Sequence, residues 1–302
     1  MADKYIHIDQ FLTNISVKYS NVNFFADIIA PRSPVKKSSD LYTVYQKDNL
    51  RLHDNSYRSG SAAHRVSYRV SQASYQCEEY ALEDAVTQRD RDNADLPLNP
   101  EIDTTENLTE LMMLSRENRI ALVALDSSVV TQTASPSPKW DGSSPTPKKD
   151  IFTGIDAIQN STLRAPTDIF IPFKVAMSLA RTSDYTNDYK SGVDLVNTFG
   201  LPAKLWGLNV HIVTVGYASS DMIGASDPTM TALWSDNVLI AFIDPIPSTK
   251  KITFMRTFEK QSRMVLKETR PMEHADIIQV YEELDEALVS AECGYLLTDC
   301  LT

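Results

Sequence analysis

Two stretches in the first quarter of the chain have the apolar and polar pattern of β-strands. Residues 41–46 are rich in β-branched and aromatic side chains, and in residues 65–71 the apolar Val66, Tyr68 and Val70 alternate with arginine and serine. The two predicted strands bracket a loop of about twenty residues, whereas hairpin loops usually have roughly two to five. Loops of that length are normally functional or disordered, so we interpret this hairpin as a candidate binding element.

A long helix is predicted after the hairpin. Asp103 and Glu106 have the spacing of a capping box, which indicates a helix from there to about Leu125. The segment Ile120–Leu125 is apolar on all sides, so the second half of the helix should be enclosed by its own domain or by a neighbour. We interpret this helix as a central spine.

The remaining segments mix both periodicities. Residues 131–149 contain four prolines and many serines, which indicates an exposed, irregular connection. Helices are expected over 151–159 and 174–181. Strands are expected over residues 168–172, 209–216, 234–244, 252–258, 277–281 and 287–297. This order predicts a mixed α+β fold with a βαβ-like middle.

Composition narrows the class of protein. The chain has 302 residues, 42% of them hydrophobic, and no apolar run long enough to span a membrane; its N-terminus lacks the pattern of a signal peptide. Three cysteines without CxxC spacing favour reduced, buried thiols over disulfides or zinc. A net charge of −11 argues against a protein that grips nucleic acid by its phosphates, but it does not exclude a wall that encloses nucleic acid.

No group of residues has the pattern of a catalytic or metal site. No two histidines lie at the helical spacing that binds a metal, and His211 is expected to be a core residue. Asp90, Asp92 and Glu101 fit three positions of a calcium loop, but Asp95 stands where that loop needs glycine, so we interpret them as solvated carboxylates. The chain also lacks a GxSxG elbow and glycine-rich phosphate loops. We therefore expect no cofactor, no metal and no enzymatic activity.

Charge is distributed unevenly along the N-terminal half. Residues 47–75 hold five basic and two acidic side chains, a local charge of +3, whereas residues 76–110 hold eleven carboxylates and two arginines, a charge of −9. Opposite patches on one polypeptide favour self-association. The alternatives are a solvated hairpin with ordinary surface charge, or aromatic residues that pack inside the hairpin itself.

The interaction hypothesis names two sets of side chains. The candidate interface residues of the loop are Lys47, Arg51, His53, Tyr57, Arg58, Arg65, Tyr68 and Arg69. The candidate acidic partners are Glu78, Glu79, Glu83, Asp84, Asp90 and Asp92.

Seven segments spread over nearly the whole chain stand in a recognisable order: residues 24–35 (FFADIIAPRSPV), 74–86 (SYQCEEYALEDAV), 116–125 (RENRIALVAL), 139–151 (KWDGSSPTPKKDI), 165–179 (APTDIFIPFKVAMSL), 232–244 (ALWSDNVLIAFID) and 292–299 (ECGYLLTD). Together and in this order, they resemble the major capsid proteins of tailed bacteriophages with the Hong Kong 97-type fold. One departure is Thr167–Asp168, where the family usually has asparagine after the proline.

The resemblance implies a division of the chain. It comprises an N-terminal arm (1–40), an extended loop (41–75), a peripheral domain with the spine helix at about 103–125 (76–164), an axial domain (165–250), and closing strands that return to the peripheral domain (251–302).

The resemblance also implies function and partners. Copies of the chain would assemble into pentamers and hexamers of an icosahedral head in the host cytoplasm and would enclose double-stranded DNA without reading its sequence. Portal, scaffolding and decoration proteins are the other partners that it implies, and no membrane is involved. Some family members form a Lys–Asn cross-link, but no motif ties Lys47 or Asn55 to that role, and we expect salt bridges instead. A cellular nanocompartment shell and a mixed α/β enzyme are the alternative functions.

Overall fold

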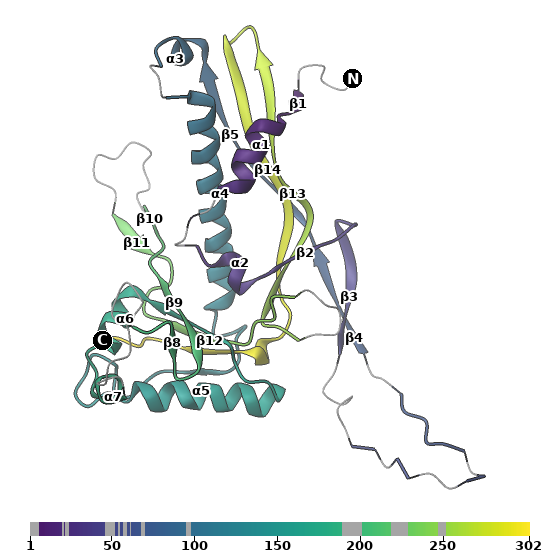
Figure 1. Cartoon of the computed structure of the whole chain (residues 1–302), viewed down its shortest axis with the longest axis vertical. Coiled ribbons are helices and arrows are strands. Elements are labelled where there is room, and N and C mark those ends of the chain that lie inside the picture. The colour runs from purple at the N-terminus through teal and green to yellow at the C-terminus, as the bar shows by residue number, and fades with distance from the viewer. Residues whose placement is uncertain are drawn as a thin grey trace.

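The fold was determined as a computed structural model. It describes residues 6–19, 21, 24–45, 52–53, 55–56, 59–60, 62–67, 70–94, 98–188, 201–218, 229–246 and 252–302. The body is elongated, with a sheet of long strands and a long helix at one end and a second sheet with shorter helices at the other (Figure 1). The predicted mixed α+β class is confirmed.

The first sheet has the strand order β1-β13-β14-β5, and β2 pairs with β13. Its strands are β1 (Ile6–Ile8), β2 (Arg32–Pro34), β5 (Glu78–Thr87), β13 (Met255–Arg270) and β14 (Ala275–Leu288). Helices α1 (Gln10–Lys18) and α4 (Pro100–Ala124) pack on this sheet, and Leu12, Met112 and Val280 belong to the core between them. The sheet therefore joins the start of the chain to its last third.

Helix α4 is the predicted spine, but it begins three residues earlier than expected. Asn99 is its N-cap and accepts hydrogen bonds from the N–H groups of Glu101 and Ile102, and Pro100 occupies the first turn. Asparagine followed by proline strongly favours the start of a helix. The asparagine side chain accepts from the free N–H groups of the first turn, and proline has no N–H that would need a partner there. The short helices α2 (Ala26–Ile29) and α3 (Gln88–Asp92) lie near its two ends (Figure 1).

The second sheet has the order β6-β15-β12-β7-β9-β8. Its strands are β6 (Thr133–Ala134), β7 (Asp168–Pro172), β8 (Lys204–Leu205), β9 (Leu208–Val213), β12 (Val238–Ala241) and β15 (Gly294–Leu297). Three helices, α5 (Pro147–Thr162), α6 (Phe173–Leu179) and α7 (Ser183–Asp188), lie at the same end of the molecule (Figure 1). The core between α5, α6 and this sheet is mainly aliphatic and also contains the rings of Trp140, Tyr185 and Tyr295. A small hairpin, β10 (Gly216–Ala218) with β11 (Met230–Ala232), extends from this end.

A two-stranded ribbon of β3 (Ser39–Tyr45) and β4 (Val70–Gln76) projects from the body (Figure 1). The first strand was predicted correctly. The second was predicted over 65–71 but lies at 70–76, and the described residues 62–67 form no strand. The reason is packing: Tyr75 stacks on Phe258 of β13 with ring centroids 4.5 Å apart, whereas Val66 is half exposed.

Two other predictions need correction. The proline-rich segment 131–149 is not wholly exposed, because Trp140 is fully buried and its indole N–H donates to Asp150 Oδ2 at 2.9 Å. Residues 287–297 are not one strand: β14 ends at Leu288, a short 3-10 helix follows, and β15 joins the second sheet. The closing segment thus contributes to both sheets.

Candidate subunit-interaction surface

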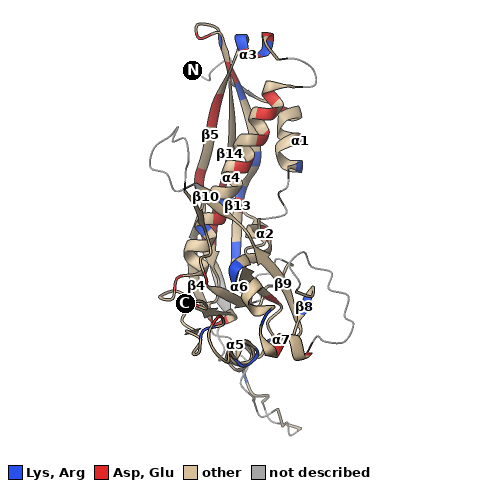
Figure 2. Ribbon diagram, turned by 90° about the vertical axis from the view of Figure 1, so that its left-hand side faces the viewer, with Lys and Arg blue, Asp and Glu red and all other residues tan. Residues whose placement is uncertain are grey.

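Strand β5 is an acidic strand at the open edge of the first sheet. It pairs with β14 along one side, and no strand of the described residues pairs with its other side. Four of the predicted acidic partners, Glu78, Glu79, Glu83 and Asp84, are exposed on this strand, and Figure 2 shows acidic positions along β5 and α4. An open edge is a template for pairing with another chain unless charge or cover protects it. This edge therefore favours a partner that is basic.

The other two acidic candidates already have local roles. Asp90 completes a capping box with Thr87 at the start of α3, with its Oδ2 accepting from the Thr87 hydroxyl at 2.6 Å, and these hydrogen bonds lower the pKa of Asp90. Asp92 accepts from Gln88 Nε2 at 2.9 Å. Glu101, the third residue of the rejected calcium pattern, pairs with Lys267 at 2.9 Å. These carboxylates stabilise the end of the first sheet at which α3 lies.

Only part of the candidate loop falls within the described residues. His53 and Arg65 are both exposed. Two apolar residues nearby, Leu52 and Val66, are also exposed, Leu52 completely. The other predicted interface residues, Lys47, Arg51, Tyr57, Arg58, Tyr68 and Arg69, lie outside the described residues.

The base of the β3–β4 ribbon is anchored to the body by aromatic packing. Tyr42 and Tyr75 both contact Phe258, with ring centroids 5.0 and 4.5 Å away. The N–H of Gln76 donates to Asp285 Oδ2 at 3.0 Å, and burial nevertheless raises the pKa of Asp285. Part of the aromatic richness seen in the sequence therefore fixes the base of the ribbon to β13 of the body, which is neither packing inside the hairpin nor a contact with another subunit.

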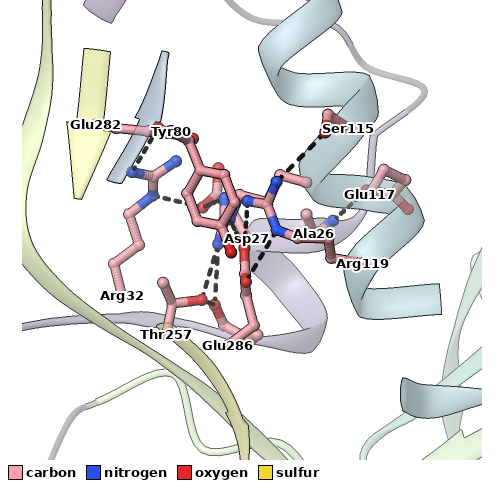
Figure 3. Close-up of polar contacts among 12 residues, drawn as sticks. Ala26, Asp27, Arg32, Tyr80, Ser115, Glu117, Arg119, Thr257, Glu282 and Glu286 are labelled. Carbon is pink, nitrogen blue, oxygen red and sulfur yellow. Dashed lines mark hydrogen bonds and ion pairs between the residues drawn. The ribbon is translucent and has the colours of Figure 1, made fainter. Parts of the chain in front are cut away.

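A buried polar cluster joins the N-terminal arm, the spine helix and the first sheet (Figure 3). At its centre Arg116 of α4 is almost fully buried; its guanidinium donates to Asp27 Oδ1 at 2.6 Å, to Thr257 Oγ1 at 3.0 Å and to the Ala30 carbonyl at 3.4 Å. Arg32 of β2 donates to Asp27 at 2.8 Å and to Glu259 at 2.6 Å. One arginine from the spine and one from the arm therefore hold the same carboxylate.

The pKa values in this cluster are set by its arginines and by burial. The Asp27 side chain is more than half exposed, and Arg116 and Arg32 outweigh its partial desolvation and lower its pKa to about 2. On the next turn of the spine, Arg119 donates to both oxygens of Glu286 and lies 3.7 Å from the centre of the Tyr80 ring. Burial raises the pKa of Tyr80 to about 12. The paired charges fix α4 against β5 and β14.

Glu117 lies next to Arg116 and has a different environment. Its Oε2 accepts from the backbone N–H groups of Phe25 and Ala26 at 3.0 and 2.7 Å, while Oε1 has no hydrogen-bond partner within the described part of the chain. Burial raises the pKa of Glu117 to about 7, although both amides and Arg116 act in the opposite direction. The sequence carried a signal for this cluster, because Arg116, Glu117 and Arg119 interrupt an apolar stretch of helix and buried charges need partners.

The residues considered for catalysis or metal binding are hydrogen-bonded or packed against neighbouring side chains. His211 Nε2 lies 2.9 Å from Asp168 Oδ1, and its ring stacks on Phe170; the side chain is partly buried rather than enclosed in the core. The three cysteines are free and buried, as predicted. Within the described ranges no group of His, Cys, Asp and Glu could hold a metal ion, and no helix is long and apolar enough to cross a membrane.

Comparison with proteins of known structure shows which fold this architecture has. No protein-family model matches the chain. The structure is similar to that of a phage-related protein from Bordetella bronchiseptica RB50, with a TM-score of 0.74, 20% sequence identity and 97% of each chain covered. The mature capsid of bacteriophage PhiM1 matches with a TM-score of 0.57 and 10% identity over 92% of this chain and 87% of that one. The chain has the Hong Kong 97-type capsid fold.

Two curated relatives of this capsid fold are named as major capsid proteins. One, from Pseudomonas phage JBD67, is 26% identical over 163 residues, which is 52% of this chain and 53% of that protein. The other, from Burkholderia phage BcepMu, is 20% identical over 302 aligned residues, 96% of each chain. The chain thus spans about half the length of the first relative and nearly all of the second.

Proposed function

We propose that this chain is the major capsid protein of a tailed phage, which assembles as pentamers and hexamers into an icosahedral head around double-stranded DNA. Its fold and both curated relatives support this function. The structural observation that carries the proposal is a projecting ribbon whose loop exposes Leu52 and Val66. A single copy leaves these two side chains in water, whereas a neighbouring copy in a closed ring can cover them.

The proposed contact between copies joins the basic loop of one subunit to the acidic edge of its neighbour. The loop contributes exposed Arg65 and, by sequence, Arg51, Arg58 and Arg69; the edge contributes Glu79 and Glu83 of β5. Complementary charges of this kind set register and speed association more than they add affinity. The negative net charge agrees with a wall that encloses DNA without gripping its phosphates.

A charge-swap experiment tests this contact. The variant Glu79→Lys/Glu83→Lys should lose assembly into rings or shells, measured by light-scattering mass and negative-stain electron microscopy. A variant with Arg51, Arg58, Arg65 and Arg69 all changed to Glu should fail in the same way, and combining both sets should restore assembly. The matched control Asp156→Lys/Glu273→Lys makes the same change in net charge at exposed positions off the edge strand. Normal shells from both reversed variants would refute the contact.

The partners and location follow from the same proposal. The protein would act in the virion after assembly in the host cytoplasm, with portal, scaffolding and decoration proteins as further partners, and it would have a structural rather than an enzymatic role. A cellular nanocompartment shell is the second candidate. It is less supported, because both curated relatives are named as phage proteins. Purified shells that contain a cargo protein rather than DNA would favour the nanocompartment.

A further inference from the structure

The arm and the spine meet at an unusual helix cap. Helix α2 has only four residues, and its N-cap Phe25 has no side-chain oxygen to accept from the first N–H groups. Glu117 of α4 supplies that oxygen instead, because its Oε2 accepts from both Phe25 and Ala26. A helix of one turn is not stable by itself in water. The position of α2 therefore depends on a carboxyl group that belongs to another helix.

This carboxyl group is poorly suited to carry a charge. Glu117 is fully buried, and its Oε1 has no hydrogen-bond partner among the described residues. An ionised carboxylate with one unsatisfied oxygen in an apolar interior is costly, whereas the neutral acid is much less so. The adjacent core cluster, which includes Phe25, Ala26 and Ile120, excludes water from this side.

The charged groups around Glu117 do not cancel this cost. Arg116 on its own helix favours the ionised form, but its guanidinium is bonded to Asp27, Thr257 and Ala30. Asp27 of α2 favours the neutral form; Arg32 of β2 pairs with Asp27, and Glu286 of β14 pairs with Arg116. On the far side of Phe25, His211 of β9 is paired with Asp168 of β7.

The junction also has room to rearrange. A cavity of about 170 Å³ lies between the arm and the spine, lined by Asn21, Phe24, Ala26, Asp27, Met113 and Arg116. This cavity is partly open to solvent beside the exposed Asp27, so the segment around α2 borders unfilled space on the arm side of α4.

We propose that Glu117 is a proton-dependent latch that docks the arm segment around α2 onto the spine helix. The two amide hydrogen bonds by themselves favour the ionised carboxylate, but the cost of burying its charge is larger. The latch is therefore closed when Glu117 is protonated, and it loosens as the carboxyl group ionises, because undocking exposes the charge to water. The inference does not depend on shell assembly, since all the groups involved lie within one chain.

The direction of the pH dependence follows from linkage. The folded pKa of about 7 lies above the ordinary value of 4.5, so the stabilising contribution is complete below about pH 4.5 and is lost as pH rises through 7. If undocking exposes Glu117 fully and returns its pKa to 4.5, the equilibrium constant for docking falls about 70-fold between pH 5 and pH 8.5, which is the upper bound of the effect.

Hydrogen exchange of the full-length chain tests the latch. In the wild type, protection of the amides in residues 25–29, corrected for intrinsic exchange, should fall by tens of fold between pH 5 and pH 8.5. Glu117→Gln keeps an accepting oxygen but cannot ionise, so its protection should be independent of pH. Glu110→Gln is the control: Glu110 lies on the same helix and bonds Tyr19 and Asn21 of the arm, so that variant should behave as the wild type.

Two results would overturn the proposal. One is flat protection in the wild type across this pH range, which decides the question even if Glu117→Gln does not fold. The other is an equal loss of protection in Glu117→Gln and the wild type, which would assign the pH dependence to another group.

Discussion

Replacing Arg116 by methionine should destabilise the fold by about 3 kcal/mol. Removing one partner from a buried ion pair typically costs about 3–5 kcal/mol, because it leaves the other charge buried and unpaired. Three features place Arg116 at the lower end of that range. The Asp27 side chain is more than half exposed, so only Glu286 is a buried carboxylate partner, and each of these two carboxylates keeps a second arginine. Arg32 remains on Asp27 at 2.8 Å, and Arg119 remains on Glu286 at 2.8 Å. Thr257 Oγ1 still donates to the Ala30 carbonyl at 2.9 Å.

Urea unfolding followed by tryptophan fluorescence measures this change, since Trp140 and Trp234 are fully buried. With a slope of about 3 kcal/mol per molar urea, the midpoint should fall by roughly 1 M at matched protein concentration. Arg181→Met removes the same charge from an exposed position and should shift stability by less than about 0.5 kcal/mol. If Arg116→Met left the midpoint where the control leaves it, the cluster would not hold the arm to the spine.

Three further changes test other parts of the fold. Gly294→Ala would place a methyl group inside the Phe254 ring, so thermal unfolding should show a loss of about 3 kcal/mol or more; an unchanged Tm would contradict the packing of β15. Leu163→Gly should stabilise by about 1 kcal/mol in the same assay, because exposed Leu163 ends α5 with a φ of 56°; a loss of stability would show that its side chain matters more than its backbone. The stability that the ion pairs of Asp27 contribute is present above the ordinary pKa of 3.8 and is lost as the pH falls through about 2. The free energy of unfolding of Asp27→Asn should therefore depend less on pH below pH 4 than that of the wild type. Parallel plots of this free energy against pH for the variant and the wild type would argue against the pairing.

Local patterns in the sequence predicted elements well where a strong signal acts alone. The spine helix, the strand at 168–172 and the first ribbon strand lie within a few residues of their predicted places. The second ribbon strand was misplaced because the alternating apolar and polar residues at 65–71 do not face a core. Tyr75, by contrast, packs on Phe258, which lies about 180 residues further along the chain. Contacts between distant segments of this kind cannot be derived from periodicity.

The candidate site was predictable only in part. Clustering of carboxylates identified the acidic edge, but the sequence could not separate Glu79 and Glu83 on an exposed strand from Asp90 and Asp92, which hydrogen-bond within and next to α3. The buried cluster around Arg116 was missed, since its partners come from the arm and from two strands at the other end of the chain. Its only local signal is charge within an apolar helix.

The measurement that tests the central claim most directly is negative-stain electron microscopy of the purified chain together with its light-scattering mass. We expect closed shells, or rings of five and six subunits, with masses that are multiples of the 33.8 kDa chain. A uniform monomer across a range of salt and protein concentrations would contradict the proposal that this chain builds a shell from copies of itself.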